Sequence, residues 1–270
     1  MTMNLPSCNT IELHQESGAL RITLNRPDAR NAMNLAMVEE LMDTFAAISE
    51  SNEIRAVVLR GAEGNFCAGG DIKDMSQVGQ LTGESDENRI YTLNRKFGIL
   101  ITQVNAAPQV VISLLEGAVL GGGFGLACVS DIAIADSKAQ FGIPETTLGI
   151  PPAQIAPFVV ARVGLTQARR LVLTGARFNG DEARALGVAH FTTASSEELQ
   201  KVGEQQLQQV MRCAPLANRL TKDLILSVGK IEHEQLLDNA AKAFAEAVQS
   251  DEGREGMCAF IEKRPARWTK

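Results

Sequence analysis

The 270-residue sequence predicts an α/β fold, with a sheet-containing core over residues 1–190 and a helical region over residues 191–270. Short apolar runs rich in valine and isoleucine alternate with segments of helical periodicity, which is typical of strands alternating with helices. Twice, a buried strand runs into a glycine cluster that opens a helix. From Thr166 onward the pattern is mostly helical, and no proline- or serine-rich linker divides the two parts.

The N-terminal elements have clear start and stop signals. Residues 10–27, TIELHQESGALRITLNRP, are expected to form two short strands around a Ser-Gly turn, ended by a proline. Residues 34–50 place apolar side chains at helical spacing, with Asn34 as the N-cap. The run AVVLRG that ends at Gly61 is expected to be a buried strand.

The central and C-terminal parts continue this alternation. A long helix is expected from about Glu87 to Asn105, then the strand QVVISLLEG, the glycines of GGGFG at 121–125, the helix GFGLACVSD and the strand IAIAD. The later helices are expected at TQARRLVLTG, GDEARALG, residues 196–212, 214–229 and 232–249, and DEGREGMCAFIEK.

Composition argues against several classes of protein. The net charge is -6 with no basic run, so nucleic acid is not an expected partner. The longest nearly uncharged stretch, residues 109–130, is broken by Glu116 and by glycines, so no membrane span is expected. The N-terminus does not resemble a secretory signal, and the five cysteines form no CxxC pair, so reduced thiols and a cytoplasmic location are expected. Three scattered histidines predict no metal site.

The two glycine clusters have two possible explanations. The sequence GGGFGL matches neither the GxGxxG dinucleotide fingerprint nor a P-loop. Free N–H groups at the first turn of a helix carry partial positive charge, and bare backbone lets a ligand oxygen approach them. Two such turns would form a two-donor pocket for a developing oxyanion. Equally, the glycines could serve only to pack a helix closely on a strand.

Six stretches in order resemble the enoyl-CoA hydratase/isomerase (crotonase) family. They are LNRPDARNAM (24–33), FCAGGDIKDM (66–75), GAVLGGGFGLACVSDIAIAD (117–136), AQFGIPETTLGI (139–150), VLTGARFNGDEARALGV (172–188) and AFIEKRPARW (259–268). The resemblance implies a spiral of ββα turns with a C-terminal helical trimerisation region, an acyl-CoA thioester as substrate and no separate cofactor, because CoA is part of the substrate. It also implies a homotrimer or homohexamer.

The resemblance carries roles to particular positions. Gly70 and Gly122 match the two oxyanion-hole donors of the family. Arg30 matches a contact to a CoA phosphate, and Phe260 and Lys263 match positions that reach the CoA of a neighbouring subunit; Arg30 and Lys263 could also be ordinary surface charges. The backbone expected along the CoA comprises Cys67, Ala68, Gly70, Asp71, Ile72 and Lys73. Asp131 is expected to be structural.

One catalytic carboxylate is kept where family hydratases have two. Glu145, in the PE of FGIPE, matches the second glutamate, whereas the first position is Gly125. Gly125 is expected to open volume beside the acyl group for a branched substrate. The next loop, LGIPPAQIAP, also departs from the family's glycine-rich turn, and Ala153 matches a residue whose N–H lies near the catalytic water.

These departures leave the use of the single carboxylate open. Glu145 could take a proton from water and deliver it to carbon, could shuttle a proton between carbons, or could act with a group from the substrate. The chain is similar to bacterial hydratases of branched glutaconyl-CoA thioesters, which predicts hydration of 3-isohexenylglutaconyl-CoA or a related 3-substituted glutaconyl-CoA in acyclic terpene breakdown. The alternatives are a Δ3,Δ2-enoyl-CoA isomerase, a decarboxylase or thioester hydrolase, and a non-catalytic acyl-CoA-binding homologue.

Overall fold

The computed structural model describes residues 5–71 and 84–269. Its larger sheet has six strands in the order β1-β2-β3-β4-β6-β9. Only the hairpin β1–β2 is antiparallel, and every later pair in this sheet is parallel. The strands are β1 (Ile11–Glu16), β2 (Ala19–Leu24), β3 (Ala56–Gly61), β4 (Val110–Leu115), β6 (Ile132–Asp136) and β9 (Phe191–Thr193). Three short strands form a second sheet: β5 (Ala118–Leu120), β7 (Gln140–Gly142) and β8 (Arg177–Phe178).

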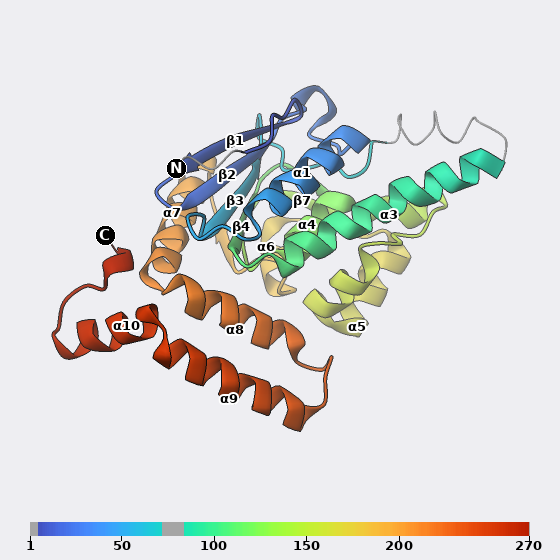
Figure 1. The fold of residues 1–270 in the computed structure, drawn as a ribbon. Coiled ribbons are helices and arrows are strands. Elements are labelled where there is room, and N and C mark those ends of the chain that lie inside the picture. Colours follow the sequence, from blue (N-terminus) through green and yellow to red (C-terminus); the bar gives the residue numbers. More distant parts are fainter. Residues whose placement is uncertain (1–4, 72–83, 270) are drawn as a thin grey trace.

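Helices cover the sheet and form the C-terminal part (Figure 1). The α-helices are α1 (Leu35–Ile48), α3 (Glu84–Ala106), α4 (Gly122–Val129), α5 (Ala156–Thr174), α6 (Gly180–Ala185), α7 (Ser196–Arg212), α8 (Pro215–Ser227), α9 (His233–Gln249) and α10 (Asp251–Ile261). Short 3-10 turns occupy η1 (Pro27–Ala29), η2 (Pro144–Leu148) and η3 (Arg267–Thr269).

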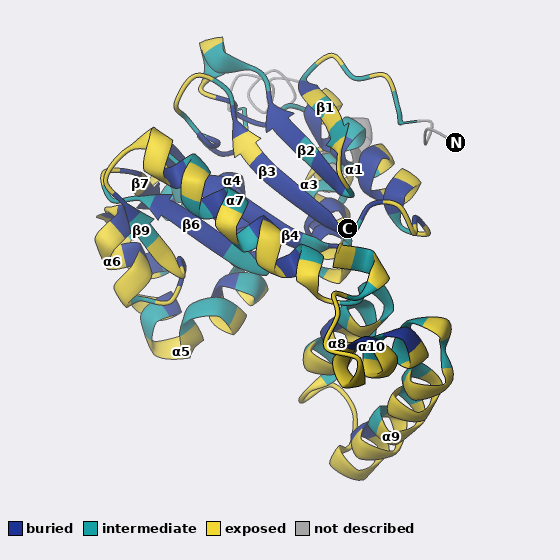
Figure 2. Cartoon of the chain, turned by 90° about the vertical axis from the view of Figure 1, so that its left-hand side faces the viewer, coloured by how far each residue is buried: buried dark blue, intermediate teal, exposed yellow. Residues whose placement is uncertain are grey.

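The two faces of the larger sheet are buried against different layers. On β3, Val57 and Leu59 point into the main core with residues of α1, α3 and α4, whereas Val58 points toward α7. This alternation follows from the period-2 geometry of a strand. Helix α7 supplies Leu199, Leu207 and Val210 to the second cluster, and Figure 2 shows it lying across the sheet. Because both faces of the sheet are covered, the sequences of the parallel strands are nearly continuous apolar runs.

Most of the expected elements are confirmed. The Asn34 side chain caps α1, because its Oδ1 accepts a hydrogen bond from the Met37 N–H at 3.0 Å. Helix α5 begins at Ala156, well before the expected start at Thr166, and the positive φ of Gly164 (75°) interrupts it. The short strands β5, β7, β8 and β9 were not anticipated, because two or three residues carry too little periodicity.

The packing divides the chain later than residue 190. Strand β9 pairs with β6 through Ile134 and Phe191, and α7 packs on β4 and β6. The sheet-containing core therefore continues through Arg212, and only α8, α9 and α10 project from it (Figures 1 and 2). The cause is that β9 is too short to be recognised as a strand from sequence.

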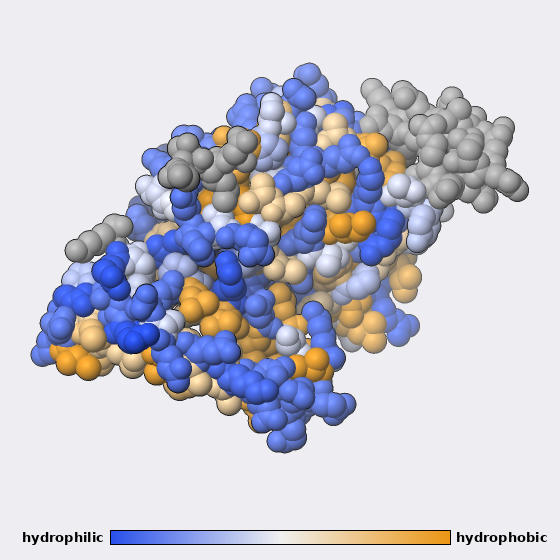
Figure 3. All heavy atoms as spheres, viewed as in Figure 1, coloured by the Kyte–Doolittle hydropathy of each residue, from blue (hydrophilic) through white to orange (hydrophobic). Residues whose placement is uncertain are grey.

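The projecting part is held by a buried ion pair and leaves apolar side chains exposed. Lys222 of α8 donates to Asp131 Oδ2 at 2.7 Å and to the Gln109 carbonyl at 3.0 Å, and the same Asp131 oxygen accepts the Val111 N–H. Asp131 is therefore structural, as expected. Exposed hydrophobic residues of α8–α10 include Ile225, Leu237, Phe244, Phe260 and Ile261, and orange side chains reach the surface in this region of Figure 3.

No helix in the described ranges is long and apolar enough to cross a membrane.

Candidate active site

The two glycine clusters lie in contact. Cys67 forms a parallel bridge to β5, donating its N–H to the Ala118 carbonyl at 2.8 Å and accepting the Leu120 N–H at 2.9 Å. This bridge brings Gly69 against Gly121, since a Cβ on either glycine would stand 3.5–3.7 Å from the other's Cα. Both glycines have positive φ, +100° and +48°, a region that side chains rarely adopt.

Two backbone N–H groups next to this contact have no protein acceptor. Around Gly70, the Met33 N–H donates to the Gly69 carbonyl at 2.8 Å and the Asp71 N–H donates to the Met33 carbonyl at 2.9 Å. These bonds involve the neighbours of Gly70 and leave its own N–H without an acceptor in the described ranges. Gly122 is the first residue of α4, so its N–H has no intrahelical partner, and no other described residue accepts from it.

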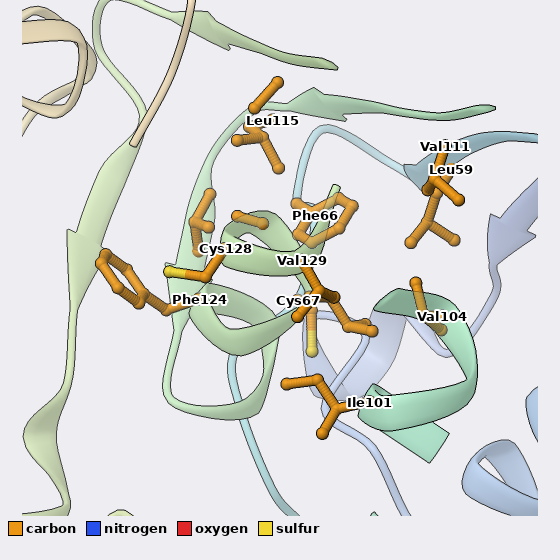
Figure 4. Close-up of a cluster of buried hydrophobic side chains, with 14 of the residues drawn as sticks. Leu59, Phe66, Cys67, Ile101, Val104, Val111, Leu115, Phe124, Cys128 and Val129 are labelled. Carbon is orange, nitrogen blue, oxygen red and sulfur yellow. The ribbon is translucent and has the colours of Figure 1, made fainter. Parts of the chain in front are cut away.

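Helix α4 is fixed rigidly, so the position of Gly122 is well defined. All of its residues are buried. Figure 4 shows Phe124, Cys128 and Val129 of α4 among side chains from β3, β4, α3 and the 66–67 segment. The Phe124 ring makes edge contacts with the rings of Phe141 and Phe178, with centroids 6.3 and 6.0 Å away. A tightly packed helix presents its first N–H groups without reorganisation.

Glu145 lies against the same glycines. It belongs to η2, and its Oε1 is 2.6 Å from the point where a Cβ on Gly121 would stand. Its Oε2 is buried and has no hydrogen-bond partner. Burial raises the pKa of this carboxyl, and its own backbone N–H partly opposes that shift. A carboxyl with an unpartnered oxygen and a raised pKa is suited both to accept and to donate a proton.

Position 125 is not open, which corrects the expectation of extra volume there. A Cβ on Gly125 would stand 2.5 Å from Cγ2 of Ile155 and 2.9 Å from Cδ1 of Ile101. Two isoleucines therefore occupy the space beside Gly125. Gln154 points elsewhere, since its Nε2 donates to Asn94 Oδ1 of α3 at 2.7 Å.

The residues expected along the CoA differ in what they offer. Cys67 is buried and both its backbone polar groups bond to β5, so it positions the segment. The Asp71 carboxylate pairs with Arg26 at 2.9 Å, which braces the turn that carries Gly70. Ala68 is half-buried and donates its N–H to the Arg30 carbonyl at 3.0 Å. The Arg30 side chain is exposed beside this segment.

The remaining expected residues lie apart from the glycines or outside the described ranges. Ala153 is exposed and its N–H donates to the Pro151 carbonyl at 2.8 Å, so it does not offer that N–H to a water as expected. Phe260 is 86% exposed at the end of α10, and Lys263 is exposed just after it. Ile72 and Lys73 lie outside the described residues.

Several residues around the site were not anticipated from the sequence. A Cβ on Gly122 would stand 2.5 Å from Cε of Met33 and 3.1 Å from Cζ of Phe97, so these side chains wall the first turn of α4. Gly69 and Gly121 form the contact that aligns the two clusters. The glycines were visible as a pattern, but nothing in the sequence distinguishes the apolar wall residues from ordinary core.

Comparison with known proteins identifies the family of this chain. Residues 14–270 match the model of the enoyl-CoA hydratase/isomerase family. The chain belongs to the enoyl-CoA hydratase/isomerase family. The short-chain-enoyl-CoA hydratase of Clostridium acetobutylicum is 33% identical over 262 residues, which cover 95% of this chain and 96% of that protein. The α/β crotonase fold expected from the sequence is confirmed.

Solved structures of the family are more similar still. AtuE from Pseudomonas aeruginosa is 56% identical with a TM-score of 0.93, covering 97% of this chain and 100% of that one. An enoyl-CoA hydratase/isomerase from Marinobacter aquaeolei is 53% identical with a TM-score of 0.94 over the same shares. The family and its relatives support a carbon–oxygen lyase that acts on acyl-CoA thioesters.

Proposed function

We propose that this member of the family is a cytoplasmic hydratase that adds water across the 2,3 double bond of a branched acyl-CoA. The substrate we propose is 3-isohexenylglutaconyl-CoA or a related 3-substituted glutaconyl-CoA from terpene catabolism. One observation carries the proposal: the acceptor-free N–H groups of Gly70 and Gly122 adjoin the contact between Gly69 and Gly121, and Glu145, whose buried Oε2 has no partner, lies against Gly121. The substrate assignment rests on the overall resemblance of the sequence to hydratases of branched glutaconyl-CoA thioesters.

In the proposed mechanism the two N–H groups form an oxyanion hole. The thioester carbonyl accepts hydrogen bonds from Gly70 and Gly122, which stabilise the negative charge that develops on its oxygen when water attacks carbon 3. Removing one such donor costs roughly 3–4 kcal/mol in measured enzymes. At Gly122 only glycine fits without a rearrangement, because a Cβ there would stand 2.5 Å from Cε of Met33.

Glu145 moves the proton. Its carboxylate takes a proton from the attacking water as the C–O bond forms, and then delivers that proton to carbon 2 as the enolate collapses. General acid–base help of this kind contributes roughly 10²–10⁴-fold in rate. Ile101 and Ile155 occupy the space beside Gly125. This packing favours a mechanism in which Glu145 acts twice, rather than one in which a second group at position 125 shares the proton transfer.

The CoA and the assembly complete the proposal. Arg30 lies beside the 66–71 segment and would contact a CoA phosphate, with Ala68 along the adenine. Phe260 and Lys263 would reach the CoA of a neighbouring subunit in a homotrimer or homohexamer. The exposed apolar side chains of α8–α10 support such an assembly, because monomeric proteins rarely leave so many unburied.

Water enriched in heavy oxygen tests the proposal. After incubation with glutaconyl-CoA, we expect one labelled oxygen in a 3-hydroxyacyl-CoA product, detected by mass spectrometry. Double-bond migration without label would replace hydration by Δ3,Δ2-isomerisation, which is the second candidate because a single carboxylate suffices for it. Binding without turnover of any acyl-CoA would identify a non-catalytic homologue.

A further inference from the structure

One face of α3 runs alongside the first turn of α4. Phe97 contacts the position of Gly122, and Ile101, four residues later, contacts the position of Gly125. Residues four apart lie on the same side of a helix. The side of α3 that carries Phe97 and Ile101 therefore faces α4, and its Phe97 end lies beside Gly122, where the proposed function places the thioester carbonyl.

A polar cluster adjoins that face. The Gln154 Oε1 and the Arg95 Nη1 lie 1.9 and 2.8 Å from the point where a Cβ on Gly98 would stand. Gly98 is buried and has no side chain, so both polar groups approach the helix backbone closely. Gln154 directly precedes Ile155, which fills the space beside Gly125. The cluster thus continues the wall of the acyl space.

The cluster has hydrogen-bond donors to spare. Arg95 forms no ion pair or hydrogen bond with any residue in the described part of the chain, whereas its neighbour Lys96 pairs with Glu39. The Asn94 Oδ1 already accepts from Gln154 Nε2, which leaves the Asn94 amide group as a donor. An unpaired guanidinium beside a free amide donor suits a carboxylate, which can accept two parallel hydrogen bonds from arginine.

We infer that Arg95, assisted by Asn94, binds a carboxylate at the far end of the substrate's acyl chain. This inference rests on the proposed function, because it names the residues that select an acidic acyl group over a neutral one. The Arg95 side chain reaches along α3 to Gly98, three residues later, where its Nη1 lies beside Gln154 Oε1. The hydration chemistry itself does not depend on this contact.

The test compares two substrates that differ only at the end of the acyl chain. Glutaconyl-CoA carries the carboxylate, and trans-2-pentenoyl-CoA carries a methyl group in its place. We expect Arg95→Gln to lower the ratio of kcat/KM for glutaconyl-CoA to that for pentenoyl-CoA by roughly 10- to 100-fold, the usual effect of losing a charge-assisted hydrogen bond. Arg95→Lys should restore part of the ratio, since it keeps the charge.

Lys96→Gln is the matched control, because it removes a neighbouring cation that already pairs with Glu39. It should leave the ratio unchanged. An unchanged ratio in Arg95→Gln would overturn the inference. An equal loss of kcat/KM with both substrates would also overturn it, because Arg95 would then contact the CoA or stabilise the fold instead of binding the carboxylate. Either result leaves the proposed function standing, because heavy-oxygen incorporation into pentenoyl-CoA reports hydration independently.

Discussion

Gly121 and Glu145 are in direct contact: Oε1 of Glu145 lies 2.6 Å from where the Cβ of any larger residue at position 121 would stand. The glycine therefore does more than permit a turn, because its missing side chain leaves room for the carboxylate of the site. The Gly121 N–H also donates to the Gly142 carbonyl at 3.0 Å, which fixes the backbone at this point.

Gly121→Ala should displace Glu145 and reduce turnover. The new methyl group would overlap the carboxylate, and φ of +48° strains an alanine by about 1–3 kcal/mol. We expect kcat to fall by at least about tenfold, measured by hydration of an enoyl-CoA. Gly187→Ala is the control: its φ of +78° imposes similar strain, but nothing lies within 4 Å of its Cβ. Equal kcat in both variants would contradict a steric role for position 121.

Glu145→Gln should nearly abolish activity. Glutamine keeps the shape of the side chain but cannot accept and return a proton, so kcat should fall by roughly 10²–10⁴-fold. Steady-state kinetics with an enoyl-CoA measure the loss. Full activity in this variant would remove Glu145 from the mechanism.

The same variant should gain stability relative to the wild type as the pH rises. Burial raises the pKa of Glu145 above its usual value of 4.5, so the folded protein favours the neutral acid. The stability that this preference contributes is complete below the usual value and is lost as the pH rises through the raised pKa. Urea unfolding should therefore show the free energy of unfolding of the glutamine variant rising relative to that of the wild type as the pH increases from about 4.5 through the raised pKa. A constant difference across that range would contradict the raised pKa.

Gly125→Ala should destabilise the protein through overpacking. Its methyl group would stand 2.5 Å from Ile155 and 2.9 Å from Ile101, and such insertions typically cost about 1–3 kcal/mol. Ile101→Val in the same chain removes Cδ1, the Ile101 atom that stands 2.9 Å from this point, so we expect the double variant to lose less than the sum of the single variants in urea unfolding. Strict additivity would indicate that position 125 does not contact Ile101 in solution.

Four of the five thiols should react in two classes. Cys213 and Cys258 are exposed and should be alkylated rapidly near neutral pH. Burial raises the pKa of both Cys67 and Cys128 to about 12, so these thiols should stay unmodified until the protein is denatured. Peptide mapping by mass spectrometry after brief iodoacetamide treatment would show which sites react. Rapid labelling of Cys67 would mean that the 66–71 segment opens readily.

Local signals in the sequence predicted the local structure well. The cap at Asn34 and the glycines at 70 and 122 were identified because each reflects a constraint within a few residues. The filling of position 125 was missed, because Ile155 reaches it from a helix whose start depends on tertiary packing. The role proposed for Arg95 has no signal in the sequence, because it depends on Asn94 and Gln154, which the fold brings beside it.

The Arg55 guanidinium has a consequence for how the chain completes its fold. It donates to the carbonyls of Met211, Cys213 and Trp268, each at 2.8 Å, so a side chain from the first quarter of the sequence holds the last few residues. Closing so long a loop is entropically costly and therefore slow. A chain truncated before Trp268 would lose one of these three bonds, and nascent protein cannot complete them until Trp268 has been synthesised.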